Sequence, residues 1–403
     1  MLQRFVEIFA TSTNYQNMRI SLFLVSLLLL SCSKQEDKVI LNSIIINPDI
    51  CQNYIDLSPI LEDNVEIIKL ETSEDCLISD IDRLEFKEDK IFILDRNGQN
   101  MFVFNNKGKY INNIGHRGSG PGEFAYIWDF AFVNNLLYVH DILTHKYTIY
   151  NQNGKYVNDL KNIPHHHSIL SFDKIVYFVG NYLDPDLGDY NLYKYSISSK
   201  KIMTFLPYDK KIREKAMTYG VKSQVAKYKN KALVMYPKDD ILYEVDSNTV
   251  LPKYKIVFTK YNIPEDMKGL DGFSIFRYAR KNNFIVGLEY IQNSLDYLVG
   301  YFAHGNRYKY FIYDKNLEKS KNGDMFNISS IGGVFISNFF TNDDNEFVAI
   351  LDADDFSEMW KSSYNRGNFA NEENRMKMEE MYKSTNPGDN PIIIKFKFKS
   401  NKK

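Results

Sequence analysis

The sequence is poor in cysteine, in histidine and in motifs of catalysis. Its 403 residues include three cysteines and seven histidines, and no GxSxG, HExxH or paired CxxC pattern occurs. The sequence therefore offers no serine-hydrolase elbow, no zinc-protease helix and no cysteine-type zinc site. We expect no metal and no cofactor, and the sequence identifies no catalytic residue.

The sequence also lacks an excess of positive or negative charge. The 50 Lys and Arg residues nearly balance the 51 Asp and Glu residues. Without residues 1–31, which hold Arg4, Arg19 and Glu7, the counts become 48 and 50. Because nucleic-acid binding needs a basic face, we expect no nucleic-acid partner.

Long hydrophobic runs are rare, and the clearest one, Ile20–Leu30, is too short for a comfortable membrane span. Arg19 precedes this run and Ser31-Cys32 follows it, which is the layout of a signal peptide. We interpret residues 18–31 as a signal peptide, with Met18 as the true start and residues 1–17 upstream of it. A transmembrane anchor or a buried helix is the alternative.

The end of this run, Leu29-Leu30-Ser31-Cys32, resembles the lipobox of bacterial lipoproteins. The resemblance implies that Cys32 is acylated and becomes the mature N-terminus, although Leu30 stands where these proteins usually have a small residue. A lipid on Cys32 would anchor the protein to a membrane without spanning it. The other two cysteines, Cys51 and Cys76, either form a disulfide or stay as thiols.

The chain contains an internal repeat with an offset of 46 residues. The segment from Ile81, IDRLEFKEDKIFILDRNGQNMFVFNNKGKYI, recurs without a gap from Ile127 as IWDFAFVNNLLYVHDILTHKYTIYNQNGKYV. Each copy alternates short apolar stretches with turn residues, which predicts four strands, and the many tyrosines and phenylalanines also favour strands. Four strands in a repeat of this length are typical of β-propeller blades.

Weaker copies follow the first two. We place them at Ser168–Leu206 with an inserted loop at Leu183–Asp189, around Lys231, from Asn282 with a long insertion before Tyr308, and from Ile331 to the C-terminal PIIIKFKFK. The predicted fold is therefore an all-β β-propeller of six four-stranded blades, with seven as the alternative count. The last blade contains a helical insertion, FANEENRMKMEEMYKS from Phe369, which Asn386-Pro387-Gly388 ends.

The two ends of the domain are expected to meet. The segment VEIIKLET, from Val65, is a strand without a partner of its own, and an unpaired sheet edge is a liability. We predict that Val65–Leu70 pairs with part of Pro391–Lys399 in the last blade, which closes the ring. The domain boundaries are then an N-terminal linker at 32–63 and a propeller at 64–400.

The segment between the first two copies, GHRGSGPGEF at Gly115–Phe124, resembles the junction of NHL-type propellers. With the lipobox, ETSEDCLISDIDRLEF, IFILD and the terminal NPIIIKFKFK, the chain resembles the six-bladed β-propeller lipoproteins of Bacteroidota. The resemblance is specific in the first two blades and weak between about residues 170 and 330. It implies an outer-membrane lipoprotein on the cell surface or the periplasmic face, and Glu36-Asp37 resembles the surface-export signals of that phylum.

The glycine-rich connector is the candidate ligand site, because connectors between blades open on the central funnel of a propeller. His116, Arg117 and Glu123 are the candidate polar contacts, and Tyr126 and Trp128 are the candidate stacking surfaces. In the alternative, Arg117 and Glu123 pair with each other or with the backbone to hold the loop, and one of the aromatic residues is packed between blades.

Three further patterns are interpreted as structural. Asp95 and Asp141 hold the same place in the two clear repeats, which predicts that they accept backbone hydrogen bonds in a turn. On an extended chain His165-His166-His167 cannot all ligate one ion, and we expect a solvated loop there. The segment LDADDFSE from Leu351 lacks the glycine and the distal glutamate of a calcium loop.

Two classes of function remain. The first is a binding or scaffold lipoprotein whose propeller engages a glycan, a peptide or a partner protein. The second is a propeller enzyme, such as a lyase, hydrolase or lactonase, with residues drawn from several blades. The first is favoured, because no catalytic constellation can be read from the sequence.

Overall fold

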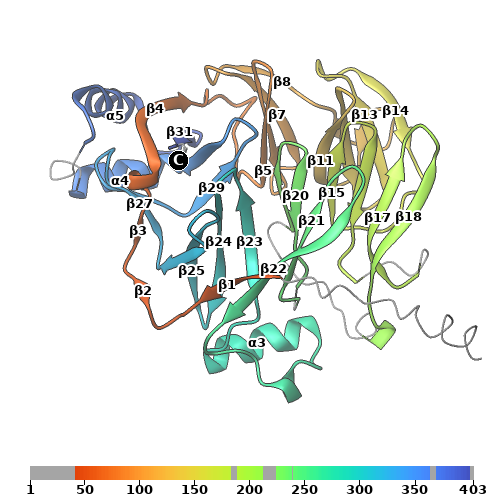
Figure 1. The fold of residues 1–403 in the computed structure, drawn as a ribbon. Helices are drawn as coiled ribbons and strands as arrows, with labels where there is room; N and C mark the ends of the chain where they lie inside the picture. Colours follow the sequence, from red (N-terminus) through yellow and green to blue (C-terminus); the bar gives the residue numbers. More distant parts are fainter. Residues whose placement is uncertain (1–40, 183–187, 212–223, 238, 364–368, 400–403) are drawn as a thin grey trace, which may run out of the picture. The chain divides into compact units, whose positions relative to one another are not determined.

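The computed structural model describes residues 41–182, 188–211, 224–237, 239–363 and 369–399. Within them, six sheets contain four antiparallel strands each, and these strands pair in chain order except at the end of the last sheet (Figure 1). The first strand of every sheet contributes to one central channel. The six sheets therefore surround a common axis as the blades of a β-propeller, which confirms the predicted fold class.

The strands of the six blades have the following bounds. Blade 1 holds β5 (Arg83–Lys87), β6 (Lys90–Asp95), β7 (Asn100–Asn105) and β8 (Tyr110–Asn113); blade 2 holds β11 (Ile127–Val133), β12 (Leu136–Asp141), β13 (Lys146–Tyr150) and β14 (Tyr156–Leu160). Blade 3 holds β15 (Ser168–Phe172), β16 (Ile175–Val179), β17 (Tyr190–Ser196) and β18 (Lys201–Pro207); blade 4 holds β19 (Val225–Tyr228), β20 (Lys231–Val234), β21 (Ile241–Val245) and β22 (Val250–Phe258). Blade 5 holds β23 (Leu288–Asn293), β24 (Tyr297–His304), β25 (Arg307–Asp314) and β26 (Lys319–Gly323); blade 6 holds β29 (Asn338–Thr341), β30 (Glu346–Leu351), β31 (Ile392–Phe398) and β4 (Leu61–Lys69).

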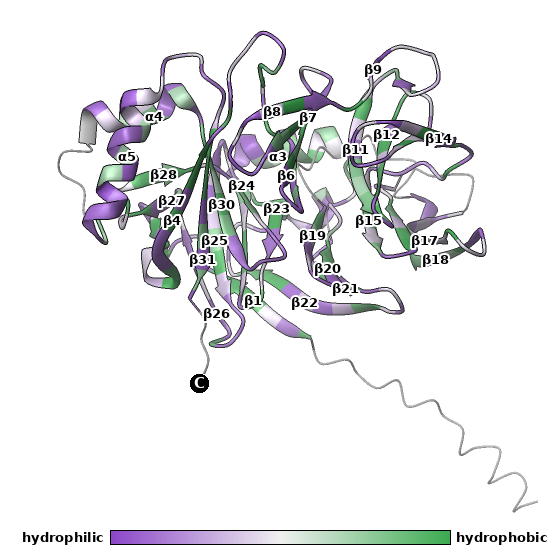
Figure 2. Ribbon diagram, turned by 90° about the horizontal axis from the view of Figure 1, so that it is seen from above, coloured by the Kyte–Doolittle hydropathy of each residue, from purple (hydrophilic) through white to green (hydrophobic). Residues whose placement is uncertain are grey.

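Burial depends on the position of a strand in its blade. The second strands β6 and β12 are buried at five of their six positions, because neighbouring blades cover both faces of the sheet. This explains why KIFILD and LLYVHD are nearly continuous apolar runs rather than alternating ones. The fourth strand β18 has no buried residue. Figure 2 shows the hydrophobic residues concentrated in the strands.

The repeated aspartates hold turns, as predicted. Asp95 accepts hydrogen bonds from the backbone N–H groups of Ser79 and Gly98, both at 2.8 Å. Asp141 accepts from the backbone N–H of Ala125 at 2.7 Å and from those of Tyr126, Leu143 and Thr144 at longer distances. Both carboxylates are fully buried, so their hydrogen bonds fix the entry to each blade.

The N-terminal segment runs along the outside of the blades. Within the expected linker at 32–63, β1 (Asn42–Ile46) adds in parallel to β22, and β2 (Cys51–Gln52) adds in parallel to β26. The next long strand, β4, pairs antiparallel with β31, with Val65 opposite Phe396 and Ile68 opposite Ile393. The predicted closure of the last blade by both ends of the domain is therefore confirmed.

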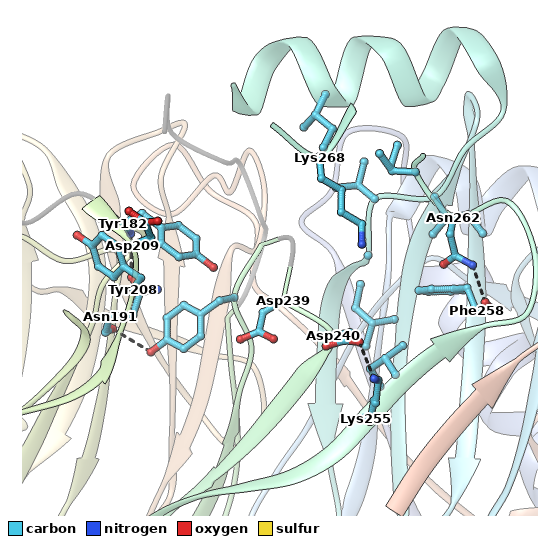
Figure 3. Close-up of a pocket in the computed structure, with 18 of the residues that line it drawn as sticks. Tyr182, Asn191, Tyr208, Asp209, Asp239, Asp240, Lys255, Phe258, Asn262 and Lys268 are labelled. Atoms are coloured by element: carbon cyan, nitrogen blue, oxygen red, sulfur yellow. Dashed lines mark hydrogen bonds and ion pairs between the residues drawn. The ribbon is translucent and has the colours of Figure 1, made fainter. Parts of the chain in front are cut away.

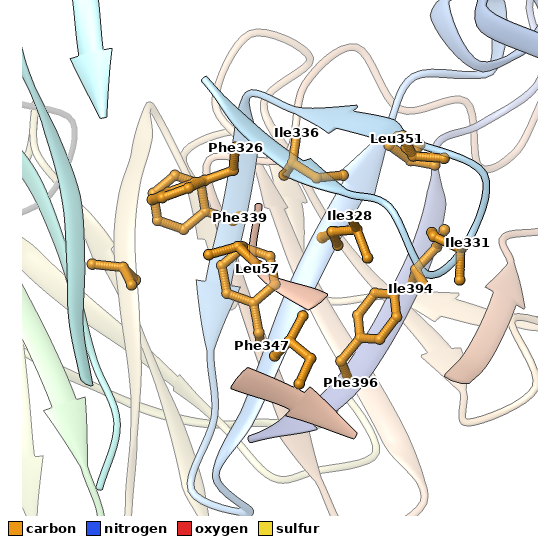
Figure 4. Close-up of a cluster of buried hydrophobic side chains, with 14 of the residues drawn as sticks. Leu57, Phe326, Ile328, Ile331, Ile336, Phe339, Phe347, Leu351, Ile394 and Phe396 are labelled. Atoms are coloured by element: carbon orange, nitrogen blue, oxygen red, sulfur yellow. The ribbon is translucent and has the colours of Figure 1, made fainter. Parts of the chain in front are cut away.

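A three-stranded sheet lies beside these blades and affects the blade count. It consists of β28 (Val334–Ile336), β27 (Phe326–Ile328) and β3 (Ile55–Asp56). With this sheet the propeller has about seven blades, and without it six. Its residues pack with blades 5 and 6 in one hydrophobic cluster, which includes Leu57, Phe326, Phe339, Phe347 and Phe396 (Figure 4).

Among the described residues, two of the connections contain α-helices whose bounds are complete. The insertion in the last blade lies where it was predicted, between β30 and β31, but it holds two helices, α4 (Ala353–Ser363) and α5 (Glu372–Ser384). The acidic segment from Leu351 is the end of β30 and the start of α4. In α5, which is mostly hydrophilic in Figure 2, Met378 is fully buried whereas Met376 is exposed.

The weaker repeats differ from the prediction in two places. The helix α3 (Gly272–Asn282), between β22 and β23, was not predicted; the side chain of Asp271 caps its first turn by accepting a hydrogen bond from the Ser274 N–H at 2.9 Å. The supposed long insertion of the fifth copy is the strand β24. The insertion at Leu183–Asp189 lies largely outside the described residues.

The long connections leave the blades on one side, which we call the loop face. In a sheet whose strands pair in chain order, the connection from the second to the third strand lies on the same side as the connection to the next blade. These connections contain α3, α4, α5 and the Gly115–Phe124 connector, whereas the turns on the opposite side have two to five residues. Candidate binding surfaces are therefore concentrated on the loop face.

Candidate functional site

The central channel is narrow, about 180 Å³ in volume, and it is lined by residues from all six blades. Arg83 of β5 lies 2.6 Å from Asp129 of β11 and 2.5 Å from Glu85. Burial alone would lower the pKa of Arg83, but the charges of Asp129 and Glu85 raise it above its ordinary value. The guanidinium therefore stays charged inside the channel.

The polar groups of the channel bind one another and join neighbouring blades. Asp129 of blade 2 also accepts a hydrogen bond from the N–H of Ile169 in blade 3 at 3.0 Å. The Oε1 atom of Gln292 in blade 5 accepts one from the N–H of Thr341 in blade 6 at 2.9 Å. These contacts hold the blades together at the axis, so the channel acts as a polar core of the ring rather than as an open funnel.

A larger cavity, of about 970 Å³, lies on the loop face between blades 3 and 4 and α3 (Figure 3). Its size is at the upper end of the range for small-molecule sites. The polar side carries four tyrosines together with aspartate and asparagine side chains, namely Tyr182, Tyr208, Tyr236, Tyr243, Asn191, Asp209, Asp239 and Asp240.

Hydrogen bonds fix the tyrosine wall in place. The hydroxyl of Tyr236 donates to the carbonyl oxygen of Asn191 at 2.9 Å, and the hydroxyl of Tyr182 donates to the carbonyl oxygen of Pro237 at 2.9 Å. The side-chain oxygen of Asn191 accepts from the N–H of Tyr182 at 2.9 Å. Blades 3 and 4 are thereby joined behind the cavity, so the wall is preorganised.

Asp239 is a carboxyl group of the cavity with a shifted pKa. It accepts hydrogen bonds from the Tyr243 hydroxyl and from the Ile241 N–H, both at 3.0 Å. Burial raises the pKa of this carboxyl above its ordinary range, and the neighbouring charge of Asp240 adds to the effect. Asp240 itself lies 3.4 Å from the ammonium of Lys255.

The opposite side of the cavity is apolar. It is formed by Ile256 of β22, Ile275 of α3, Ile263 and Ile285 of the segments that flank this helix, and Leu288 of β23. In Figure 3 Lys268 and Asn262 lie on this side, across from Tyr182 and Tyr208. The cavity is thus amphipathic, and it can bury an apolar surface while offering hydrogen bonds along one edge.

The candidate connector forms a small structure of its own. Its strand β9 (His116–Arg117) pairs in parallel with β10 (Glu123–Phe124). Glu123 lies 2.8 Å from the Nε2 atom of His116 and accepts a hydrogen bond from the Gly120 N–H at 2.7 Å, and this backbone hydrogen bond is the main reason why the pKa of Glu123 is lowered. Glu123 therefore holds the loop through His116 and the backbone, and not through Arg117, which is exposed.

Trp128 and Tyr126 follow the connector but line neither cavity among the described residues. The indole N–H of Trp128 donates to the carbonyl oxygen of His167 at 2.8 Å, and the Arg96 guanidinium lies 4.5 Å from the centre of its ring. Trp128 therefore contacts both the turn after β6 in blade 1 and the segment that leads into blade 3. The five sequence-derived site residues stay a prediction, and the structure brings only His116 and Glu123 into direct contact.

The expected solvated loop at His165-His166-His167 is wrong for two of its residues. His166 and His167 are buried, with 6% and 7% of their surface exposed. The Nδ1 atom of His166 lies 2.7 Å from the carbonyl oxygen of Pro164, and its Nε2 atom lies 2.5 Å from the Tyr147 hydroxyl. Burial lowers the pKa of both histidines to about 4, and the Arg96 charge adds to this for His167.

Of the three cysteines, Cys51 and Cys76 lie in the described part of the chain. Cys32 and the signal peptide lie outside the described residues. Cys51 and Cys76 are both free thiols, and Cys76 is buried while Cys51 is on β2 at the edge of blade 5. Within the described ranges, no helix is long and apolar enough to cross a bilayer.

A family model described as a domain of unknown function (DUF4934) matches residues 43–397, and no curated protein matches the sequence. A Bacteroides fragilis protein described as exported is similar at 21% identity, over 89% of this chain and 99% of that one, with a TM-score of 0.71. A DUF4221 member from Bacteroides vulgatus is similar at 11% identity over 86% and 99%, with a TM-score of 0.49. At 21% identity the likeness to the Bacteroides fragilis protein concerns the fold alone.

Proposed function

We propose, given that this chain belongs to the DUF4934 family, that it is an exported, lipid-anchored β-propeller that binds an extracellular ligand. The ligand is a glycan, a peptide or a partner protein, and it occupies the cavity between blades 3 and 4. The observation that carries the proposal is the cavity itself, with its preorganised tyrosine wall, its apolar opposite side and its volume of about 970 Å³.

The direction of β1 supports an arrangement in which the cavity faces away from a membrane. β1 is parallel to β22, the fourth strand of blade 4, and that strand leads to the loop face. β1 therefore begins, at Asn42, on the side opposite the loop face. With a lipid on Cys32, the short segment up to Ile40 spans at most roughly 30 Å, which keeps the propeller close to the bilayer and leaves the loop face accessible.

A cavity-filling variant tests the location of the site. Gly287 lines the cavity, and a Cβ atom at this position would meet no atom within 4 Å. Gly287→Phe should therefore fill the cavity without displacing the core. On glycan and peptide arrays with residues 33–403, we expect this variant to lose the ligand, and Arg117→Ala and Trp128→Ala to keep it. If only Arg117→Ala and Trp128→Ala lost the ligand, the binding site would lie at the connector instead.

The membrane anchor is tested separately in the native host. Cys32→Ala should release the protein from the membrane fraction, and protease treatment of intact cells should cleave the wild type if it faces outward. Unchanged membrane association of the variant would contradict the lipid anchor.

A propeller enzyme is the second candidate, and one observation favours it. Asp239 has a raised pKa and lies beside the Tyr243 hydroxyl in the large cavity, which is the setting of a carboxyl group that can donate a proton. If ligands from the arrays are converted to products, and Asp239→Asn abolishes conversion while binding persists, the enzyme reading replaces the binding module.

A further inference from the structure

A second, separate groove lies along the exposed side of α3. It has a volume of about 600 Å³ and is bounded by that helix and by the hairpin of β24 and β25. The buried side of α3 carries Ile275 and Ala279, which pack against the propeller. The groove and the large cavity are thus on different sides of the helix.

Positive charge predominates in this groove. Arg277, Arg280 and Lys281 line it, and Glu289 is the one carboxylate among the lining residues of the described chain. Burial raises the pKa of Glu289 above its ordinary range, and the nearby charge of Arg280 opposes part of this rise. None of these three cations takes part in an ion pair within the described residues, so the groove presents its positive charge to an anion.

Two exposed aromatic rings accompany the cations. Phe273 is 59% exposed and Tyr308 is 47% exposed, and they extend from the helix and from the hairpin respectively. The guanidinium of Arg277 lies 4.4 Å from the centre of the Phe273 ring, which holds it in the groove. An arginine oriented in this way can bind a carboxylate through two hydrogen bonds.

The main chain around the groove favours a polysaccharide over a peptide. β24 and β25 are paired with strands on both sides, so this wall has no free sheet edge to which an extended peptide could add. The groove offers aromatic faces and guanidinium groups instead. Sugar rings present apolar C–H faces for stacking, and uronic acids add the carboxylates that arginine recognises.

We propose that this groove binds an acidic polysaccharide, with Arg277 and Arg280 on its carboxylates and Phe273 and Tyr308 on its sugar rings. This groove is independent of the large cavity: a ligand in the groove neither requires nor excludes a ligand in the cavity.

The test measures binding of oligogalacturonate to residues 33–403 by calorimetry, with a neutral dextran oligosaccharide and a polyglutamate peptide as comparison probes. We expect affinity for oligogalacturonate to fall as salt rises, and to fall by about tenfold in Arg277→Gln/Arg280→Gln. Arg277→Lys should recover only part of the loss, because it keeps the charge without the bidentate geometry.

The matched control removes the same charge elsewhere. Lys107→Gln/Lys155→Gln alters two exposed lysines in the turns of blades 1 and 2 and should leave the affinity within about twofold. Thermal melting checks that all variants fold. Equal affinity of the arginine variant and the wild type, or no binding of oligogalacturonate at all, would overturn the proposal, and preference for polyglutamate would overturn the ligand class. Gly287→Phe should bind oligogalacturonate normally, which separates this site from the cavity.

Discussion

Acid should destabilise the propeller between pH 6.5 and about 4, because His166 and His167 are buried in their neutral form between blades 2 and 3. Burial lowers the pKa of each from 6.5 to about 4 in the folded protein. As the pH falls through this window, the unfolded chain takes up protons that the folded chain does not. Stability is therefore fully present above pH 6.5 and is lost progressively down to about pH 4.

The magnitude follows from the size of the shift. A lowering of about 2.5 pH units corresponds to about 3 kcal/mol for one histidine, since each unit is worth about 1.4 kcal/mol. The rings of His140 and His166 are stacked with centres 4.1 Å apart, and the pKa of His140 is also lowered, so a proton on one ring disfavours a proton on the other. The loss should therefore be about 3 kcal/mol or more, a large part of the 5–15 kcal/mol typical of domains.

The assay is urea unfolding of residues 33–403 at several pH values from 7 to 4.5, followed by tryptophan fluorescence. His166→Gln should be less stable at pH 7, because Tyr147 and Pro164 lose their partner, but its stability should depend less on pH. His116→Gln, at an exposed histidine, is the matched control. Asp239 and Glu289 have raised pKa values, so their contribution to the free energy of unfolding grows as the pH falls. This opposite contribution is the same in all three proteins. Equal pH dependence of the wild type and His166→Gln would refute the reasoning.

Three further predictions concern stability at neutral pH, each read as the free energy of unfolding in urea. Arg83→Met should cost about 3–5 kcal/mol, because it leaves the buried carboxylate of Asp129 unpaired. The control Lys227→Met breaks a pair with Asp343 at 3.7 Å between more exposed side chains, and it should cost less than about 1 kcal/mol. Equal costs would argue against the channel as a polar core. Lys315→Met should cost about 1–3 kcal/mol, because the ammonium group donates to the side chain of Asn293 at 2.6 Å and to the carbonyl oxygen of Ser294 at 2.5 Å. An unchanged free energy of unfolding would show that water replaces the ammonium group. Deletion of residues 390–403 removes β31 and should abolish cooperative unfolding of the whole ring, and a sharp transition in the shortened chain would contradict closure by both termini.

The architecture was predictable where the repeat kept its length. In blades 1 and 2 the turns NNKG and NQNG fall at equal positions, and Gly108 and Gly154 both have a positive φ, near 80°. Asp95 and Asp141 likewise occupy equivalent positions in the two repeats. In blades 3 to 5 the loops differ in length, so α3 was missed and β24 was taken for an insertion. The three-stranded sheet was missed because its strands are short and one comes from the N-terminal segment.

The sites were less predictable from the sequence than the fold. The large cavity combines Tyr182, Tyr236 and Ile275, which lie in three different connections within the region where the sequence pattern is weakest. No spacing rule relates such positions. The burial of His166 and His167 had one available signal, since these residues lead directly into β15, a strand buried at every position.

The N-terminal strands have a consequence for how the chain reaches its folded state. Val65 pairs with Phe396, so the edge of β4 has no partner until nearly the whole chain has been made. Contacts at such long sequence separation form slowly, because the loop between them must close first. Until then, β4 of one molecule and β31 of another are complementary edges that can pair with each other. At high concentration the refolding protein should therefore form strand-exchanged dimers before it forms disordered aggregates.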